Sequence, residues 1–289
     1  MAELLRLGVR EEAVGDCRNL TVPGPIGPLP VRVYTPLGAG DGLLPGLVFF
    51  HGGGLVAGSL DTHDGIARAL ANTARCRLIA IDYRLGPEHR FPAAVDDAIA
   101  ATRYVARHAG EFGIERARLG VCGDSAGATL AAAVCQTWMA DDLPPLALQV
   151  LLCPILDHSR PTASRRAFAQ GYLVGEAMLA HDLLHYLPPG TALEDPRVSP
   201  LRATTLSAQP PALIHTAEYD PLRDEAAAYA ERLQLAGTHV QFECHAGMVH
   251  LFYGLGQFVP RAQALLTRIG QQIEERLGAA HTQSARGNI

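Results

Sequence analysis

Six short apolar runs alternate with alanine-rich stretches along this chain of 289 residues. Most of the runs are hydrophobic at nearly every position, as is typical of parallel strands covered on both faces. The strands are predicted at Leu47–Phe50, Arg77–Ile81, Leu119–Cys122, Leu146–Leu152, Ala212–Thr216 and Val240–Glu243. The helices are predicted at Gly65–Ala74, Ala93–Ala109, Ala126–Met139, Arg223–Ala236 and Pro260–Gly278. This order predicts an α/β fold with a mostly parallel central sheet flanked by helices.

Three segments depart from the alternation. Leu20–Val22 and Val31–Tyr34 flank a turn rich in proline and glycine, which predicts a hairpin at the sheet edge. Residues 155–210 hold no clear strand and carry many prolines around a helix predicted near Glu176–Tyr186. Residues 281–289 are polar and are predicted to form a disordered tail.

Composition excludes several classes of partner and location. Hydrophobic residues make up 48% of the chain, and the net charge is −5 without a basic cluster, so nucleic acid is not expected as a partner. No apolar run reaches the ~18 residues of a membrane span, and Met1–Arg10 lacks the apolar core of a signal peptide. The six cysteines form no C-x-x-C motif, which favours free thiols in a reducing compartment. We therefore expect a cytoplasmic protein without stable membrane insertion.

Gly123-Asp124-Ser125-Ala126-Gly127 fits G-x-S-x-G, the tight turn between a strand and a helix that exposes a nucleophilic serine. The two glycines let the turn close without clashes, and the following helix would point its N-terminus at Ser125. A serine between glycines can also be an ordinary turn. The apolar strand before it and the alanine-rich helix after it favour the nucleophile.

His51-Gly52-Gly53-Gly54 fits the HGGG-type loop that offers backbone N–H groups to an oxyanion. With the serine turn, it predicts an oxyanion hole made by the N–H groups of Gly53, Gly54 and Ala126. Its position at a strand end makes His51 a poor general base. We expect its side chain to hold the loop by a hydrogen bond.

These motifs, taken with three further segments, resemble the hormone-sensitive-lipase-like esterases of the α/β-hydrolase superfamily, in their bacterial GDSAG branch. The further segments are Tyr83–Ala94, Tyr219–Glu225 and Gly247–Phe252. The resemblance runs from about Leu20 to about Leu277. It implies a catalytic domain at 20–280 with a helical cap inserted at about 155–210. Residues 1–19 would form a cap segment shorter than is usual in the family, which predicts a more open acyl site.

The base and the acid follow from the order serine, acid, histidine that this superfamily uses. Of the histidines after the acid, His250 lies in a loop just past the last strand and matches the family pattern Gly-x-x-His-x-Phe. His245 is not excluded by order alone. Asp220 follows a strand end, where such sites collect, and the family's Asp-Pro-Leu pattern selects it over Glu218 and Asp224.

Two other patterns are weaker. Gly52-x-Gly54-x-x-Ala57 imitates a dinucleotide-binding fingerprint, but Gly58–Asp61 interrupts the helix that should follow. His181 and His185 are spaced like half of a zinc site, but the central glutamate of H-E-x-x-H is absent. We therefore expect no cofactor and no metal, and a solvated helix face at His181–His185.

The predicted function is a serine carboxylesterase for short- to medium-chain acyl esters, with a small-molecule ester as its partner. Ser125, His250 and Asp220 would form the triad, with support from His51, Gly52 and Asp124. Amide or lactone hydrolysis on the same triad remains open. A binding protein is the other alternative, because plant gibberellin receptors resemble the family but lack the catalytic histidine. A homodimer through the edge of the last strand is possible.

Overall fold

The computed structural model describes residues 8–9, 11–138 and 143–286, with the backbone alone for 279–286. Several predictions fall outside these residues: the helix end at Met139, residues 1–7 and 10 of the N-terminal segment, and residues 287–289 of the tail. Within the described part of the chain, no helix is both long enough and apolar enough to cross a membrane.

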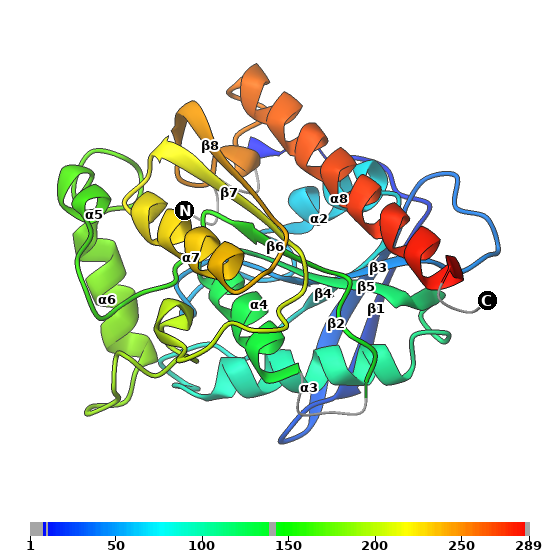
Figure 1. Ribbon diagram of the computed structural model, residues 1–289, viewed down its shortest axis with the longest axis horizontal. Coiled ribbons are helices and arrows are strands. Elements are labelled where there is room, and N and C mark those ends of the chain that lie inside the picture. The colour runs from blue at the N-terminus through cyan, green and yellow to red at the C-terminus, as the bar shows by residue number, and fades with distance from the viewer. Residues whose placement is uncertain (1–7, 10, 139–142, 287–289) are drawn as a thin grey trace.

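One eight-stranded sheet forms the centre of the molecule, in the order β1-β2-β4-β3-β5-β6-β7-β8 (Figure 1). The strands are β1 Asp16–Pro23, β2 Pro28–Thr35, β3 Leu44–Phe50, β4 Arg77–Ile81, β5 Ile114–Asp124, β6 Leu148–Leu152, β7 Ala212–Tyr219 and β8 Val240–Val249. β1 and β2 form the predicted hairpin, β2 pairs antiparallel with β4, and all other pairs are parallel. The prediction of a mostly parallel sheet is confirmed.

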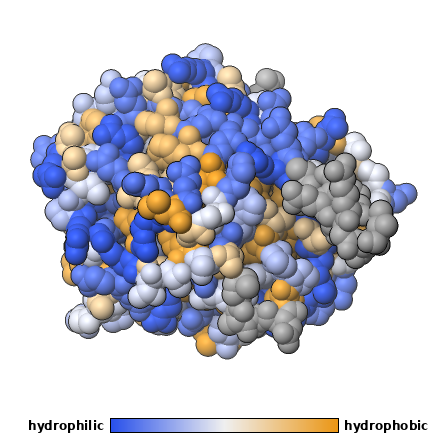
Figure 2. All heavy atoms as spheres, viewed as in Figure 1, coloured by the Kyte–Doolittle hydropathy of each residue, from blue (hydrophilic) through white to orange (hydrophobic). Residues whose placement is uncertain are grey.

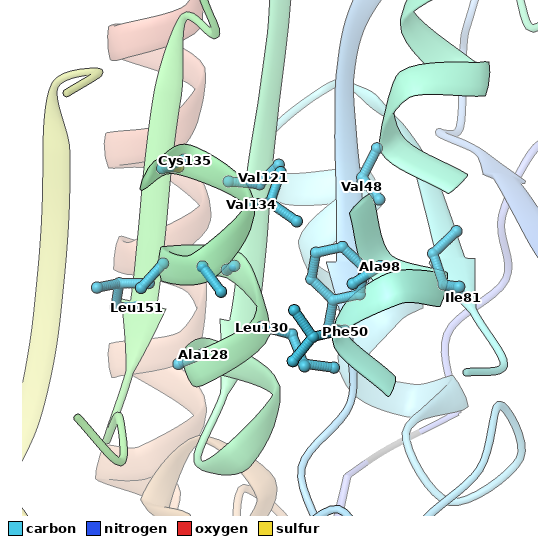
Figure 3. Packing of buried hydrophobic residues seen from close by; sticks show 14 of the residues in the cluster. Val48, Phe50, Ile81, Ala98, Val121, Ala128, Leu130, Val134, Cys135 and Leu151 are labelled. Atoms are coloured by element: carbon cyan, nitrogen blue, oxygen red, sulfur yellow. The ribbon is translucent and has the colours of Figure 1, made fainter. Parts of the chain in front are cut away.

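Helices cover both faces of this sheet (Figure 1). They are α2 Asp64–Thr73, α3 Ala93–Arg107, α4 Ala126–Thr137, α7 Arg223–Leu235 and α8 Pro260–Arg286. Successive residues of β3 point to opposite faces: Val48 and Phe50 belong to the core that also contains residues of α3, α4 and α7, whereas Leu47 and Phe49 belong to the core that contains residues of α2 and α8. Figure 3 shows Val48, Phe50 and Ala98 in the first of these cores. Burial on both faces explains why the strand sequences are almost continuously hydrophobic.

Residues 155–210 lie at one end of the sheet and contain two helices and a short 3₁₀ turn: α5 Ala163–Ala167, α6 Glu176–Tyr186 and η2 Pro200–Arg202. Buried polar contacts tie this segment to the rest of the molecule. Arg165 on α5 forms an ion pair of 3.1 Å with Glu225 on α7, and Phe91 N–H donates to the carbonyl of Tyr186 at 2.9 Å. On the face seen in Figure 2, hydrophobic residues gather in the middle and hydrophilic residues surround them.

Two element ends differ from the prediction. β8 runs to Val249, because its pairing with β7 resumes at Tyr219–Val249 after an irregularity beyond Ala217. α8 continues to Arg286, so the disordered tail predicted from residue 281 is wrong for 281–286. The polar residues there include Gln283, Ala285 and Arg286, which have good helix propensity, and low hydrophobicity alone does not end a helix.

Candidate active site

Ser125 stands at the sharp turn between β5 and α4, with a left-handed backbone (φ 53°) that side chains rarely adopt. A Cβ on Gly123 would overlap the carbonyl of Gly127, and a Cβ on Gly127 would overlap the carbonyl of Phe50. Both glycines are therefore required by close packing of the turn. The turn is held by a hydrogen bond of 2.8 Å from Ser125 N–H to the carbonyl of Leu152.

Two residues far apart in the sequence meet at this serine. His250 follows β8 directly, and its Nε2 lies 3.0 Å from Ser125 Oγ. Its Nδ1 lies 2.9 Å from Oδ2 of Asp220, just beyond β7. The other oxygen of Asp220 accepts the N–H of Leu222 at 2.8 Å. This is the arrangement of a nucleophile, a base and an acid that orients the base.

The loop of residues 51–54 passes beside the serine and is anchored to the residue before it. Gly52 N–H donates to Oδ1 of the buried Asp124 at 2.9 Å. Gly53 and Gly54 both have positive φ, so the loop path needs glycine there. Ala126 is the first residue of α4, so no carbonyl within the helix accepts its N–H. Gly53 and Gly54 line the cavity beside Ser125, and Ala126 directly follows the serine in the chain.

Histidine and tyrosine side chains support this loop from beneath. His51 Nδ1 lies 2.8 Å from the carbonyl of Gly52, and the His51 ring stacks on Tyr83 with centroids 4.4 Å apart. Burial, together with the nearby His63, lowers the pKa of His51 to about 4. The sequence analysis did not identify His63, whose Nε2 lies 3.3 Å from Gly52 N and 3.4 Å from Oδ2 of Asp124. Its position beside the loop follows only from the fold.

A cavity of about 310 Å³ opens beside Ser125, and most of its lining surface is apolar. The cap supplies one wall through α6. Asp182, which the sequence analysis placed on a solvated helix face, lines this cavity instead with only 20% of its side chain exposed. Burial raises the pKa of its carboxyl above the usual range. The prediction of a solvated face is thus wrong for Asp182, although His181 is 64% exposed.

The rival acids and base have other partners. His245 Nε2 lies 3.0 Å from Nδ1 of His215, on the face of the sheet that packs against α8. Glu218 accepts the N–H of Gly247 at 2.7 Å, and Asp224 accepts the N–H of Ser164 at 2.7 Å. The geometry therefore favours His250 and Asp220.

Two groups of side chains in the described residues bring possible metal ligands within 4.8 Å of one another. Cys153, Asp220 and His250 form the first, which overlaps the triad, and burial raises the Cys153 thiol pKa well above its usual range. The second joins Glu243 to the His215–His245 pair. Its carboxylate already forms an ion pair with Arg268, a cation that opposes metal binding.

Gly52 and Gly54, the glycines of the stretch that imitates a dinucleotide-binding fingerprint, line the cavity. The next helix, α2, begins only at Asp64. A dinucleotide site needs the helix to start at the glycines, so that its N-terminus can face a pyrophosphate. The geometry therefore gives no support to a dinucleotide at this loop.

Comparisons with known proteins agree with this geometry. A family model described as the alpha/beta hydrolase fold matches residues 47–254. The carboxylic ester hydrolase LipN of Mycobacterium tuberculosis is 43% identical over 84% of this chain and 65% of its own length. The ethyl acetate hydrolase of Pseudomonas putida is 38% identical over 86% of this chain and 79% of its own. The solved ester hydrolase from the metagenome of Lake Arreo, complexed with a derivative of bipyridine phosphonate, superposes with a TM-score of 0.92 at 42% identity, covering 96% of this chain and 88% of that one.

Proposed function

Because this chain belongs to the α/β-hydrolase family that contains these carboxylic ester hydrolases, we propose that it is a serine carboxylesterase for short- to medium-chain acyl esters. The observation that carries the proposal is the relay from Ser125 through His250 to Asp220, at 3.0 and 2.9 Å, on the edge of an apolar cavity. The cavity volume of about 310 Å³ is at the small end of ligand pockets, which supports short rather than long acyl chains.

In this proposal, Ser125 Oγ attacks the ester carbonyl while His250 Nε2 takes its proton. Asp220 keeps His250 in the tautomer that leaves Nε2 free to accept. The N–H groups of Gly53, Gly54 and Ala126 stabilise the oxyanion, and removing one such donor typically costs ~10²–10³ in rate. His250 then protonates the departing alcohol, and water releases the acid by the same steps in reverse.

The test is hydrolysis of p-nitrophenyl esters from acetate to palmitate by the wild type and by Ser125→Ala. We expect rates that are highest for short chains and that fall by several orders of magnitude in the variant. Ser207→Ala is the matched control, because Ser207 is exposed and lies outside the cavity. A folded wild type without activity on these esters, or an active Ser125→Ala, would contradict the proposal. Anilide and lactone substrates assayed in parallel separate the related hydrolase activities.

We also propose a cytoplasmic location. All six cysteines are unpaired, and four of them are buried. Free thiols persist in reducing compartments, whereas proteins in oxidising compartments tend to form disulfides. Cell fractionation should find the protein with cytoplasmic markers, and recovery from an extracellular or periplasmic fraction would contradict this location.

A further inference from the structure

The cavity beside Ser125 contains a carboxylate that the proposed reaction does not use. Asp182 lies on α6 of the cap, and its Oδ2 occupies the place that a Cβ on Gly54 would take. Gly54 is one of the proposed oxyanion donors. The carboxylate is therefore next to the place where negative charge would develop during the reaction.

Asp182 has little to compensate its charge. Among the described residues, its one polar contact is with Nδ1 of the exposed His181, at a long 3.3 Å. His181 in turn stacks on His185 with ring centroids 4.2 Å apart. Among the described residues that line the cavity there is no lysine, no arginine and no other acid. The cationic partners of this partly buried carboxylate are His181 and His185, which carry charge only when protonated. With these histidines neutral, the carboxylate lacks the full hydration and the ion pair that normally stabilise one.

This placement has a consequence for substrates. An uncompensated negative charge beside the oxyanion site opposes the developing negative charge of a neutral ester, and opposes an anionic ester more strongly. A substrate that brings its own positive charge would pair with Asp182 and remove this repulsion. It would also supply the counter-ion that the free protein lacks.

Resting on the proposed esterase function, we propose that Asp182 makes this pocket select esters that carry a cationic ammonium group close to the scissile carbonyl, as esters of amino alcohols do. Asp182 then acts as a determinant of specificity, and a neutral ester of the same shape is the poorer substrate.

Acetylcholine and 3,3-dimethylbutyl acetate provide the test, because they differ only in a positively charged nitrogen in place of a carbon. Their kcat/KM values are compared by titrating the released acid at a mildly alkaline pH, where histidines of ordinary pKa are neutral. We expect the wild type to prefer acetylcholine by about tenfold, the size expected for a partly buried charge pair. Asp182→Asn should lose this preference, and its rate on the neutral ester should rise rather than fall, because the charge that opposes the oxyanion is gone.

Glu176→Gln is the matched control, because Glu176 is an exposed acid on the same helix and does not line the cavity. It should keep the wild-type preference. The proposal is overturned if the wild type shows no preference for the cation, or if Asp182→Asn shows the same preference as the wild type.

A second measurement does not depend on turnover of these esters or on the variant. Choline should inhibit hydrolysis of p-nitrophenyl butyrate by the wild type more strongly than 3,3-dimethylbutanol does. Equal inhibition by the two alcohols overturns the proposal for Asp182. Absence of p-nitrophenyl butyrate hydrolysis would instead show that the proposed esterase function has failed.

Discussion

Replacing Asp220 with asparagine should remove most of the activity by changing the tautomer of His250. Both carboxylate oxygens of Asp220 accept hydrogen bonds, one from Leu222 N–H at 2.8 Å and the other from His250 Nδ1 at 2.9 Å. An asparagine side chain of the same shape has only one accepting oxygen. Two donors therefore compete for one acceptor at a site with no exposure to solvent.

Either orientation of the amide is unfavourable. If its oxygen stays with Leu222, its NH₂ group faces His250 Nδ1, which must then give up its proton and accept. The ring proton moves to Nε2, where it faces Ser125 Oγ, so the base can no longer accept the serine proton. If the amide turns round, its NH₂ group opposes the N–H of Leu222, and one buried donor is left unpaired at about 1–3 kcal/mol. Loss of the orienting acid lowers kcat by about 10⁴ in a serine hydrolase, or about 5.5 kcal/mol in barrier height.

The assay is kcat/KM for p-nitrophenyl butyrate, with thermal unfolding to show that the variant is folded. Asp224→Asn is the control, because Asp224 is a nearby acid at the start of α7 that bonds Ser164 rather than the histidine. It should retain activity. A folded Asp220→Asn within tenfold of the wild type would refute the role of Asp220 in orienting His250.

Three further predictions concern stability and assembly. Arg165→Met should lower the free energy of unfolding by about 3–5 kcal/mol in urea denaturation, because it leaves the buried carboxylate of Glu225 unpaired. Arg166→Met changes an exposed residue and should show no such loss. Burial lowers the pKa of His215 to about 3 from 6.5, so the unfolded chain binds more protons below pH 6.5 and the free energy of unfolding falls on acidification. This group alone should lower it by about 2 kcal/mol between pH 7 and 5. An equally steep loss in His215→Gln would argue against this role of His215. β8 is the last strand of the sheet, and we expect its edge to pair with the same edge of a second copy. Sedimentation equilibrium should then give the mass of a dimer of 30.8 kDa chains. The mass of a single chain would contradict this pairing.

Much of the central sheet could be predicted, because strands buried on both faces are hydrophobic at almost every position. β4 matches its predicted range, Arg77–Ile81, since all but its first residue are buried. Ser125 was recognisable because the glycines on either side are needed for the tight turn. The extension of β8 was not predictable from hydrophobicity, because most residues in Cys244–Val249 are exposed or half-buried.

The wall of the cavity that α6 supplies could not be predicted from the sequence. From the sequence alone, Asp182 is expected on the polar surface of α6. Its place beside Gly54 follows only from the way the cap packs over the cavity. The contact between His63 and Gly52 could not be predicted either. The two residues are eleven positions apart, and they meet because the loop between them folds back. The sequence pattern favours His250 over His245, and the fold adds the partner that chain order could not give: the pairing of β8 with β7 places His245 beside His215.

The most direct test of the proposed mechanism is labelling with a p-nitrophenyl phosphonate, whose tetrahedral phosphorus mimics the reacting ester carbon. We predict that one phosphonyl group attaches per chain, that activity falls in proportion, and that peptide mass spectrometry locates the group on Ser125. The variant Ser125→Ala should remain unlabelled. Inactivation with the group on another residue, or equal labelling of Ser125→Ala, would contradict the assignment of Ser125 as the nucleophile.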